Sequence, residues 1–294
     1  LHVSQHSFPT RRSSDLQAAG LLARFVCPVT KLNELASTSP ASSPPMQVAA
    51  ILRGGKTAGE FLANLETDLA TLAAFPTSGS DAFVADTLEL RIPTDALPVV
   101  TLRKVTAAIV ALLARQPGKT RQLYLEIAPS PDLAEQLAQL AESGEKLRET
   151  TGIALGYKLR TGGSDAASVP SVPHVAAAIT AARTHKLAMK CTGGLHHPLH
   201  GKQAGTDHAL HGFINLLAAA ALAHNREVTA EMLEAVLAEE QATAFVFGPE
   251  SLSWRDLTLT ATELASARNQ LLGSFGSCYA DLPQAELQRL GWWQ

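Results

Sequence analysis

The stretch that decides the fold reads Gly-Tyr-Lys-Leu-Arg-Thr-Gly-Gly over residues 156–163, and Ala-Met-Lys-Cys-Thr-Gly-Gly follows over residues 188–194. Each segment is a short apolar run that carries one lysine and closes in Thr-Gly-Gly. Residues 172–185, which lie between them, have the apolar spacing of a helix. The order strand, glycine-rich turn and helix occurs twice. This order is that of the βα units of a parallel sheet. This stretch therefore predicts an α/β fold.

The same alternation continues on both sides of this stretch. Strands are predicted at residues 21–27, 47–52, 87–92, 123–127, 153–159, 187–191, 242–247 and 274–278. Helices are predicted at residues 57–73, 101–115, 132–143, 172–185, 207–224, 229–239 and 262–272, with a hairpin at 252–259. About eight strands alternating with helices indicate a single-domain (β/α)8, TIM-like barrel over residues 21–292. The alternative is an open doubly wound sheet, which normally carries a Gly-x-Gly-x-x-Gly turn that this sequence lacks.

Residues 1–16 differ from the rest of the chain. Residues 8–16 read Phe-Pro-Thr-Arg-Arg-Ser-Ser-Asp-Leu and resemble translated sequencing-adapter read-through found in some assembled genomes. The segment is polar and aperiodic, and it lacks the apolar run of a signal peptide. We expect it to be disordered and of adapter origin. Residues 37–45, rich in Ser and Pro, are expected to form a loop.

The composition excludes several classes of function. The 294 residues are 46% hydrophobic, carry a net charge of −3 and include three widely spaced cysteines. No basic surface for nucleic acid is indicated, and no apolar run approaches the roughly 20 residues that span a bilayer. Unpaired cysteines favour a reducing compartment. We expect a cytoplasmic protein with a small-molecule substrate and neither nucleic-acid nor membrane partners; the oligomeric state is left open.

Charged side chains recur near the ends of the predicted strands. Strand alternation places four pairs on shared faces: Glu89 with Arg91, Tyr124 with Glu126, Lys158 with Arg160, and Lys190 with Thr192. Unpaired charges are costly to bury. One explanation is a structural ion-pair network of Glu89 and Glu126 with Lys158 and Arg160 that fills a polar barrel interior. The explanation that we favour is a ligand site at the carboxyl ends of the strands, where barrel enzymes carry their chemistry.

Glycine pairs close both lysine segments. Gly162-Gly163 and Gly193-Gly194 are expected to precede helices, where free N–H groups and the helix dipole attract anions. Arg160 would bind a phosphate or a carboxylate with two parallel hydrogen bonds. The substrate is therefore expected to carry an acidic group.

Histidines gather after the second lysine segment, at residues 196, 197, 200, 208 and 211. We expect His196, His197 and His211 to act as hydrogen-bonding or acid–base groups around the ligand, with Asn215 next along a predicted helix face. One alternative is a divalent metal held by His211, Glu126 and either His196 or His197. The other is a set of purely structural hydrogen bonds.

The paired segments Lys-Leu-Arg-Thr-Gly-Gly and Lys-Cys-Thr-Gly-Gly resemble the paired lysine strands of class I aldolases of the deoxyribose-phosphate type. The resemblance implies that Lys158 forms a Schiff base and that Lys190 lowers its pKa through like charge. Gly193-Gly194 would match the turn after the second lysine. The chain departs from the family at Arg160, where the family has a small residue, and at residues 196–198, which read His-His-Pro.

A second likeness spans most of the chain. The patterns Lys-x-Arg-x-Gly-Gly, Lys-x-Thr-x-Gly-Leu-His-His-Pro and His-Gly-Phe-x-Asn occur at residues 158–163, 190–198 and 211–215. They resemble a family of uncharacterised bacterial proteins, and this likeness implies no particular activity.

These observations predict a cofactor-independent lyase or isomerase that acts on a small anionic carbonyl compound through a lysine amine. Lys158 or Lys190 would supply the amine, and Glu126 would be the general acid–base group. Substrate contacts are expected from Arg160, Gly162, Gly163, Thr192, Gly193, Gly194, His196, His197, His211 and Asn215. The alternatives are a metal-assisted enzyme that uses the histidines of residues 196–211, and a non-catalytic ligand-binding or scaffold protein.

Overall fold

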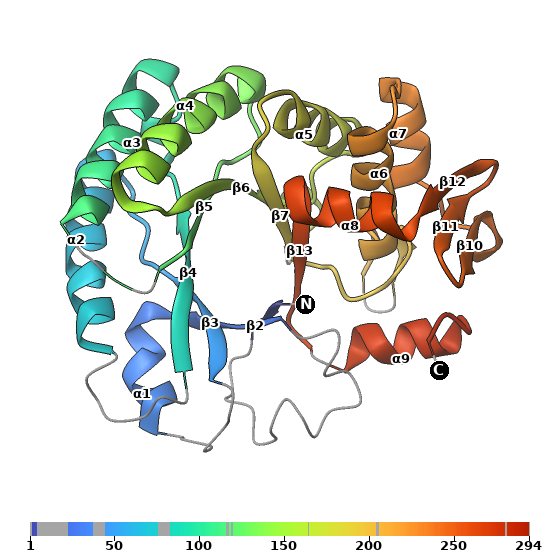
Figure 1. The fold of residues 1–294 in the computed structure, drawn as a ribbon, viewed down its shortest axis with the longest axis horizontal. Helices are drawn as coiled ribbons and strands as arrows, with labels where there is room; N and C mark the ends of the chain where they lie inside the picture. The colour runs from blue at the N-terminus through green and yellow to red at the C-terminus, as the bar shows by residue number, and fades with distance from the viewer. Residues whose placement is uncertain are drawn as a thin grey trace. The chain divides into compact units, whose positions relative to one another are not determined.

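The computed structural model describes residues 2–4 (backbone only), 23–37, 45–75, 83–115, 118, 120–163, 165–203, 206–279 and 281–293. The chain divides into two compact units, Leu1–Lys158 and Leu159–Gln294, each considered by itself below. Both units contain parallel strands accompanied by helices (Figure 1). The mixed α/β class predicted from the alternation of strands and helices is confirmed.

The first unit is built on a parallel sheet in the order β1-β2-β3-β4-β5-β6. Its strands are β1 (His2–Ser4), β2 (Arg24–Pro28), β3 (Met46–Ile51), β4 (Phe83–Arg91), β5 (Gln122–Glu126) and β6 (Ala154–Arg160), the last of which continues into the second unit. Strands that follow one another in the chain are neighbours in the sheet. This order is the one expected of successive βα units.

The helices of the first unit are α1 (Leu32–Ser37), α2 (Ala58–Ala74), α3 (Val99–Ala114) and α4 (Leu133–Thr151), with short 3-10 turns at Val29–Lys31 and Thr94–Ala96. In Figure 1, α2, α3 and α4 follow one another along the outer side of the strands. The buried side of α3 carries Leu102, Val105, Ile109 and Leu113 at helical spacing. The core of this unit lies between that apolar layer and the sheet.

The predicted end of the helix at Gly144 was wrong. The helix α4 continues to Thr151 and ends at Gly152, whose φ of +75° is left-handed. A Cβ atom on Gly144 would lie 3.2 Å from Cβ of Leu155. Gly144 therefore allows α4 to lie close to β6, whereas Gly152 adopts the backbone conformation that ends a helix.

The second unit contains the parallel pair β7 (Ala188–Thr192) and β13 (Leu272–Ser277). Its helices are α5 (Val172–Thr184), α6 (Phe213–Asn225), α7 (Ala230–Leu237), α8 (Ala261–Gln270) and α9 (Leu282–Arg289), with 3-10 turns at Ala166–Ser168 and Ala242–Ala244. Helix α6 packs against α5, α7 and α8, as Figure 1 illustrates. Its alanine-rich surface is buried nearly all round, so the neighbouring helices approach it closely.

Two predictions for this unit were wrong. Residues 242–247 do not form a strand of the main sheet, because β10 (Phe245–Gly248) pairs antiparallel with β11 (Ser251–Trp254). The hairpin predicted at residues 252–259 is confirmed by β11 and β12 (Leu257–Thr260). Helix α6 begins after Gly212 rather than at Asp207, because the intervening residues include β9 (Ala209–Leu210), which pairs with β8 (Gly201–Lys202).

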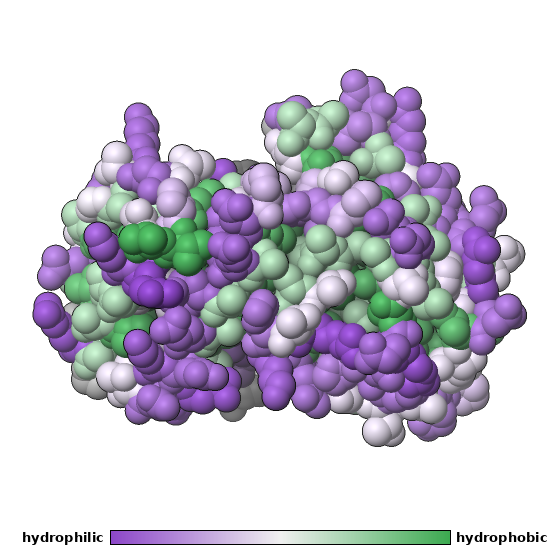
Figure 2. Space-filling model, turned by 90° about the horizontal axis from the view of Figure 1, so that it is seen from above, coloured by the Kyte–Doolittle hydropathy of each residue, from purple (hydrophilic) through white to green (hydrophobic). Residues whose placement is uncertain are grey.

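Strand β1 lies inside residues 1–16, where disorder was predicted, and its three residues pair with β2. The rest of that range, and residues 38–44 of the predicted Ser/Pro loop, fall outside the described residues. Within the described chain, no helix is long and apolar enough to cross a membrane. On the face drawn in Figure 2, hydrophilic side chains (purple) are widespread and hydrophobic ones (green) form separate small patches.

Candidate functional site

The first unit brings three charged side chains together near the carboxyl end of its sheet. Nζ of Lys158 lies 2.9 Å from Oε2 of Glu89 and 2.9 Å from Oε2 of Glu126. All three residues are buried, with exposed fractions of 8% for Lys158, 1% for Glu89 and 5% for Glu126. We call this group the Glu-Lys-Glu cluster. Nε of Arg91 lies 3.7 Å from Oε1 of Glu126 at the edge of the cluster.

Strand register explains the cluster. Arg91 of β4 is aligned with Glu126 of β5, which is aligned with Lys158 of β6. Aligned residues of neighbouring strands point to the same face of a sheet, and residues two apart share that face. Glu89 is two residues before Arg91 in β4 and therefore lies on the same face as Arg91, Glu126 and Lys158. The shared face predicted for Glu89 and Arg91 is confirmed.

Electrostatics keep Lys158 charged. Burial by itself lowers the pKa of the ammonium group, but the charges and hydrogen bonds of Glu89 and Glu126 outweigh it, so the pKa of Lys158 is raised. The aldolase resemblance implies the opposite direction. The cluster carries two carboxylates and one ammonium group, so its formal charge is −1 when all three are ionised.

The other predicted lysine, Lys190, lies on β7 in the second unit and is fully buried. It is aligned with Ser274 of β13, and Thr192 is aligned with Gly276. Of the two lysines, Lys158 is the one whose side chain keeps a small exposed area, 10%.

The two Thr-Gly-Gly turns contact each other. The hydroxyl of Thr161 donates to the carbonyl oxygens of Thr192 and Gly193, at 3.1 and 2.8 Å. A Cβ atom on Gly193 would lie 2.5 Å from the carbonyl oxygen of Gly162, and φ of Gly193 is +90°. The motif therefore has a structural explanation, since the glycines allow two strand ends to approach and the threonine joins them.

The remaining residues of these turns also have local contacts. Nε of Arg160 donates to the carbonyl oxygen of Gly162 at 3.1 Å, so this arginine bends over its own turn. A Cβ atom on Gly163 would lie 2.5 Å from Cβ of Ser168. Gly194 has a φ of +73° and follows Gly193 in the left-handed region.

The predicted histidines of the second unit have separate partners. Nδ1 of His196 lies 2.9 Å from the hydroxyl of Ser277, and Nδ1 of His197 lies 3.2 Å from Oε2 of Glu286. His211 is buried, and its Nε2 lies 2.7 Å from the carbonyl oxygen of Pro170. Burial lowers the pKa of His196 and of His211, which favours neutral imidazoles.

Asn215 holds backbone segments together. Its Nδ2 donates to the carbonyl oxygens of Val236 and Glu239, both at 2.8 Å, and its Oδ1 accepts from the backbone N–H of His200 at 2.8 Å. The side chain is fully buried. These three hydrogen bonds tie the start of α6 to the end of α7 and to the loop after β7.

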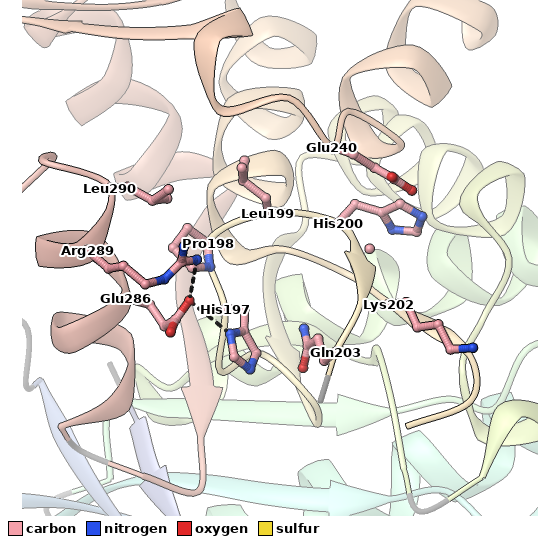
Figure 3. A pocket seen from close by; sticks show the side chains of 11 residues that line it. His197, Pro198, Leu199, His200, Lys202, Gln203, Glu240, Glu286, Arg289 and Leu290 are labelled. Atoms are coloured by element: carbon pink, nitrogen blue, oxygen red, sulfur yellow. Dashed lines mark hydrogen bonds and ion pairs between the residues drawn. The ribbon is translucent and has the colours of Figure 1, made fainter. Parts of the chain in front are cut away.

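A pocket of about 350 Å³ lies within the second unit (Figure 3). It is lined by residues 197–203, Glu240, Glu286, Arg289 and Leu290. In Figure 3, Glu286 lies between His197 and Arg289, which contact its Oε2 at 3.2 and 2.9 Å. Of the predicted site residues, the pocket contains His197. Within the described chain, no three His, Cys, Asp or Glu side chains are grouped so that they could hold a metal ion.

The sequence did not predict several residues of the Glu-Lys-Glu cluster and of the pocket. Helix α9, which supplies Glu286 and Arg289, was not predicted, although Asp281 followed by Pro283 is a typical helix start. Glu89 and Arg91 were placed among the charged residues of the predicted ligand site, but neither was given a role in it. Counting positions from the ends of the predicted strands would have aligned Arg91 with Glu126.

No protein-family model, no curated protein and no solved structure matches this chain. The two resemblances found in the sequence therefore stay predictions.

Proposed function

We propose that this protein is a cofactor-independent lyase or isomerase that acts on a small anionic carbonyl compound through a Schiff base on Lys158. The observation that carries the proposal is the placement of the Lys158 amine 2.9 Å from each of two carboxylates. A Schiff-base lysine needs a proton acceptor, because only the neutral amine is a nucleophile. Glu89 and Glu126 are both within proton-transfer distance.

Glu126 is the better candidate for accepting and returning the proton, because it is the more exposed of the two carboxylates. It takes a proton from Lys158, and the neutral amine adds to the carbonyl carbon of the substrate. Glu126 then returns the proton to the carbinolamine hydroxyl, which leaves as water. The product is a protonated imine, and Glu126 is again a carboxylate that can remove a proton from the adjacent carbon. Glu89 stays ionised and stabilises the positive charge on nitrogen.

Borohydride trapping tests this proposal. The protein is incubated with a panel of small aldehydes and ketones plus cyanoborohydride, and the adduct is measured by intact mass and located by peptide mapping. We expect one adduct per chain on Lys158, and none on Lys158→Met. Lys104→Met is the matched control, since Lys104 is an exposed lysine of α3 in the same unit.

Two results would overturn the Lys158 assignment. One is an adduct on Lys190 or on surface lysines with Lys158 unmodified. The other is a Lys158→Met variant that still forms the adduct at the rate of the unsubstituted protein.

A second candidate function is non-catalytic ligand binding or scaffolding, and the full pairing of Lys158 by two carboxylates favours it. This candidate predicts that no carbonyl compound is trapped. It also predicts that replacing the whole cluster with Gln, Met and Gln leaves ligand binding unchanged.

The closed (β/α)8 barrel and the cytoplasmic location also stay proposals. The barrel is supported by the succession of strands and helices and by the parallel order of the strands within each unit. A crystal structure tests it directly.

A further inference from the structure

Arg91 is the cation beside the Glu-Lys-Glu cluster whose guanidinium is largely free. Its side chain is 61% exposed, and within the described chain its one ion pair is the 3.7 Å contact of Nε with Glu126. Two other arginines of the same unit are ion-paired more closely. Arg53 binds the buried Asp68 through both Nε and NH2, and Arg24 binds Asp86 with two hydrogen bonds of 2.7 Å.

Arg91 and Lys158 contact opposite oxygens of one carboxylate. Nε of Arg91 is 3.7 Å from Oε1 of Glu126, and Nζ of Lys158 is 2.9 Å from Oε2. The guanidinium and the amine therefore lie on either side of one carboxylate group. A molecule that binds Arg91 with an acidic group while its carbonyl carbon reaches Lys158 must have these two groups within a few bonds of each other.

We propose that Arg91 binds the carboxylate of the substrate, and that the substrate class is the short-chain oxo acids, with the carbonyl group adjacent or near to the carboxylate. This inference rests on the proposed Schiff-base function of Lys158. A planar guanidinium with free terminal nitrogens matches a carboxylate through two parallel hydrogen bonds.

Proton transfer within the cluster fits this assignment. When Lys158 passes its proton to Glu126, the carboxylate nearest to Arg91 becomes neutral. Its repulsion of an incoming substrate carboxylate then disappears, and the charge of Arg91 is left for the substrate. The substrate carboxylate thus restores an ion pair that the proton transfer removes, and it offsets part of the cost of deprotonating a paired lysine.

Pyruvate and acetone form a matched pair for the test, because both are three-carbon ketones and only pyruvate has a carboxylate. The trapping rate with each is measured for the unsubstituted protein, Arg91→Met, Arg91→Lys and the exposed control Arg148→Met. Arg91→Met should lower the pyruvate rate by about tenfold to a hundredfold, as expected for the loss of charge-assisted hydrogen bonds. The acetone rate should fall much less than the pyruvate rate in Arg91→Met, because acetone has no carboxylate to bind Arg91. Arg148→Met should change both rates by less than about twofold. Arg91→Lys should fall between, since it keeps the charge and loses the fork geometry.

A parallel fall for pyruvate and acetone, or no fall for either, would overturn the assignment of Arg91. Lactate separates this inference from the proposed function, because it has the carboxylate but no carbonyl group. Lactate binding, followed by thermal stabilisation, should weaken in Arg91→Met and stay unchanged in Arg148→Met. Binding that depends on Arg91, without any trapped adduct, would sustain the Arg91 site and reject the Schiff base. An adduct that forms at the same rate without Arg91 would support the Schiff base and reject the Arg91 site.

Discussion

Lys158 keeps its charge although burial lowers the pKa of an ammonium group. Burial disfavours the charged form, and two carboxylates at 2.9 Å favour it more strongly. The same carboxylates make the resting amine a poorer nucleophile and provide the acceptor that can activate it. Stability and reactivity at this residue are therefore set by the same two contacts.

The charge on Lys158 makes stability depend on pH. Its pKa is raised above the ordinary value of 10.5, so the folded protein binds this proton more tightly than the unfolded chain. The stabilisation is fully present below pH 10.5 and is lost as the pH rises through the folded value. Lys158→Met should be less stable at neutral pH by about 3–5 kcal/mol, because two buried carboxylates lose their partner.

Urea denaturation between neutral pH and pH 11 measures both effects. The difference in unfolding free energy between the unsubstituted protein and Lys158→Met should shrink as the pH rises. Lys104→Met, which changes an exposed lysine, should follow the unsubstituted protein throughout. A difference that does not change with pH would mean that folding leaves the pKa of Lys158 unshifted.

The elements are delimited by side chains and glycines at their ends. Thr57 accepts a hydrogen bond from the backbone N–H of Glu60 at the start of α2, and Thr260 and Glu263 form a capping box at the start of α8. Glycine has two different uses around α4. Gly144 permits close packing, and Gly152 ends the helix with a positive φ. Position within the helix, rather than residue type, separates the two.

Gly152→Ala should lower the free energy of unfolding by about 1 kcal/mol, because alanine at a φ of +75° is strained. A Cβ atom there meets nothing within 4 Å, so the backbone conformation alone is tested. Gly59→Ala in the first turn of α2 is the matched control, since its Cβ also meets nothing within 4 Å. It should stabilise by about 0.5 kcal/mol. Equal effects of the two substitutions in urea denaturation would contradict this account of the end of α4.

At the scale of the whole molecule, the three cysteines report on packing in both units. All three are free; Cys27 and Cys191 are buried, and Cys278 is exposed. Burial raises the pKa of Cys27 to about 11 and that of Cys191 to about 12. Thiol reagents react with the thiolate. Cys27 and Cys191 are therefore protected in two ways, because burial keeps the reagent out and the raised pKa keeps the thiol protonated.

The native protein should therefore react rapidly with a thiol reagent at Cys278 alone, and at all three cysteines in denaturant. Cys278→Ser should remove the rapid phase and leave the slow ones. Intact mass after timed labelling checks this. Rapid native labelling of Cys27 or Cys191 would show that the core around that strand opens readily.

The sequence by itself determined the α/β class, most strand positions and the shared faces of the charged residues. These follow from local periodicity, because the side-chain repeat of a strand or helix is set by its own backbone. The helices predicted to start at residues 57 and 229 begin at the caps Thr57 and Thr229, whose side chains bond within their own first turn.

The sequence allowed an ion-pair network of Glu89 and Glu126 with Lys158 and Arg160, and only the tertiary structure showed that Lys158 makes those contacts. Glu89, Glu126 and Lys158 come from three strands, and their contacts depend on strand register, which a local pattern does not encode. The close approach of Gly144 to Leu155 and the antiparallel pairing of β10 with β11 are likewise contacts between elements. The rise in the pKa of Lys158 also depends on the tertiary structure. It follows from groups that are distant in sequence and adjacent in space.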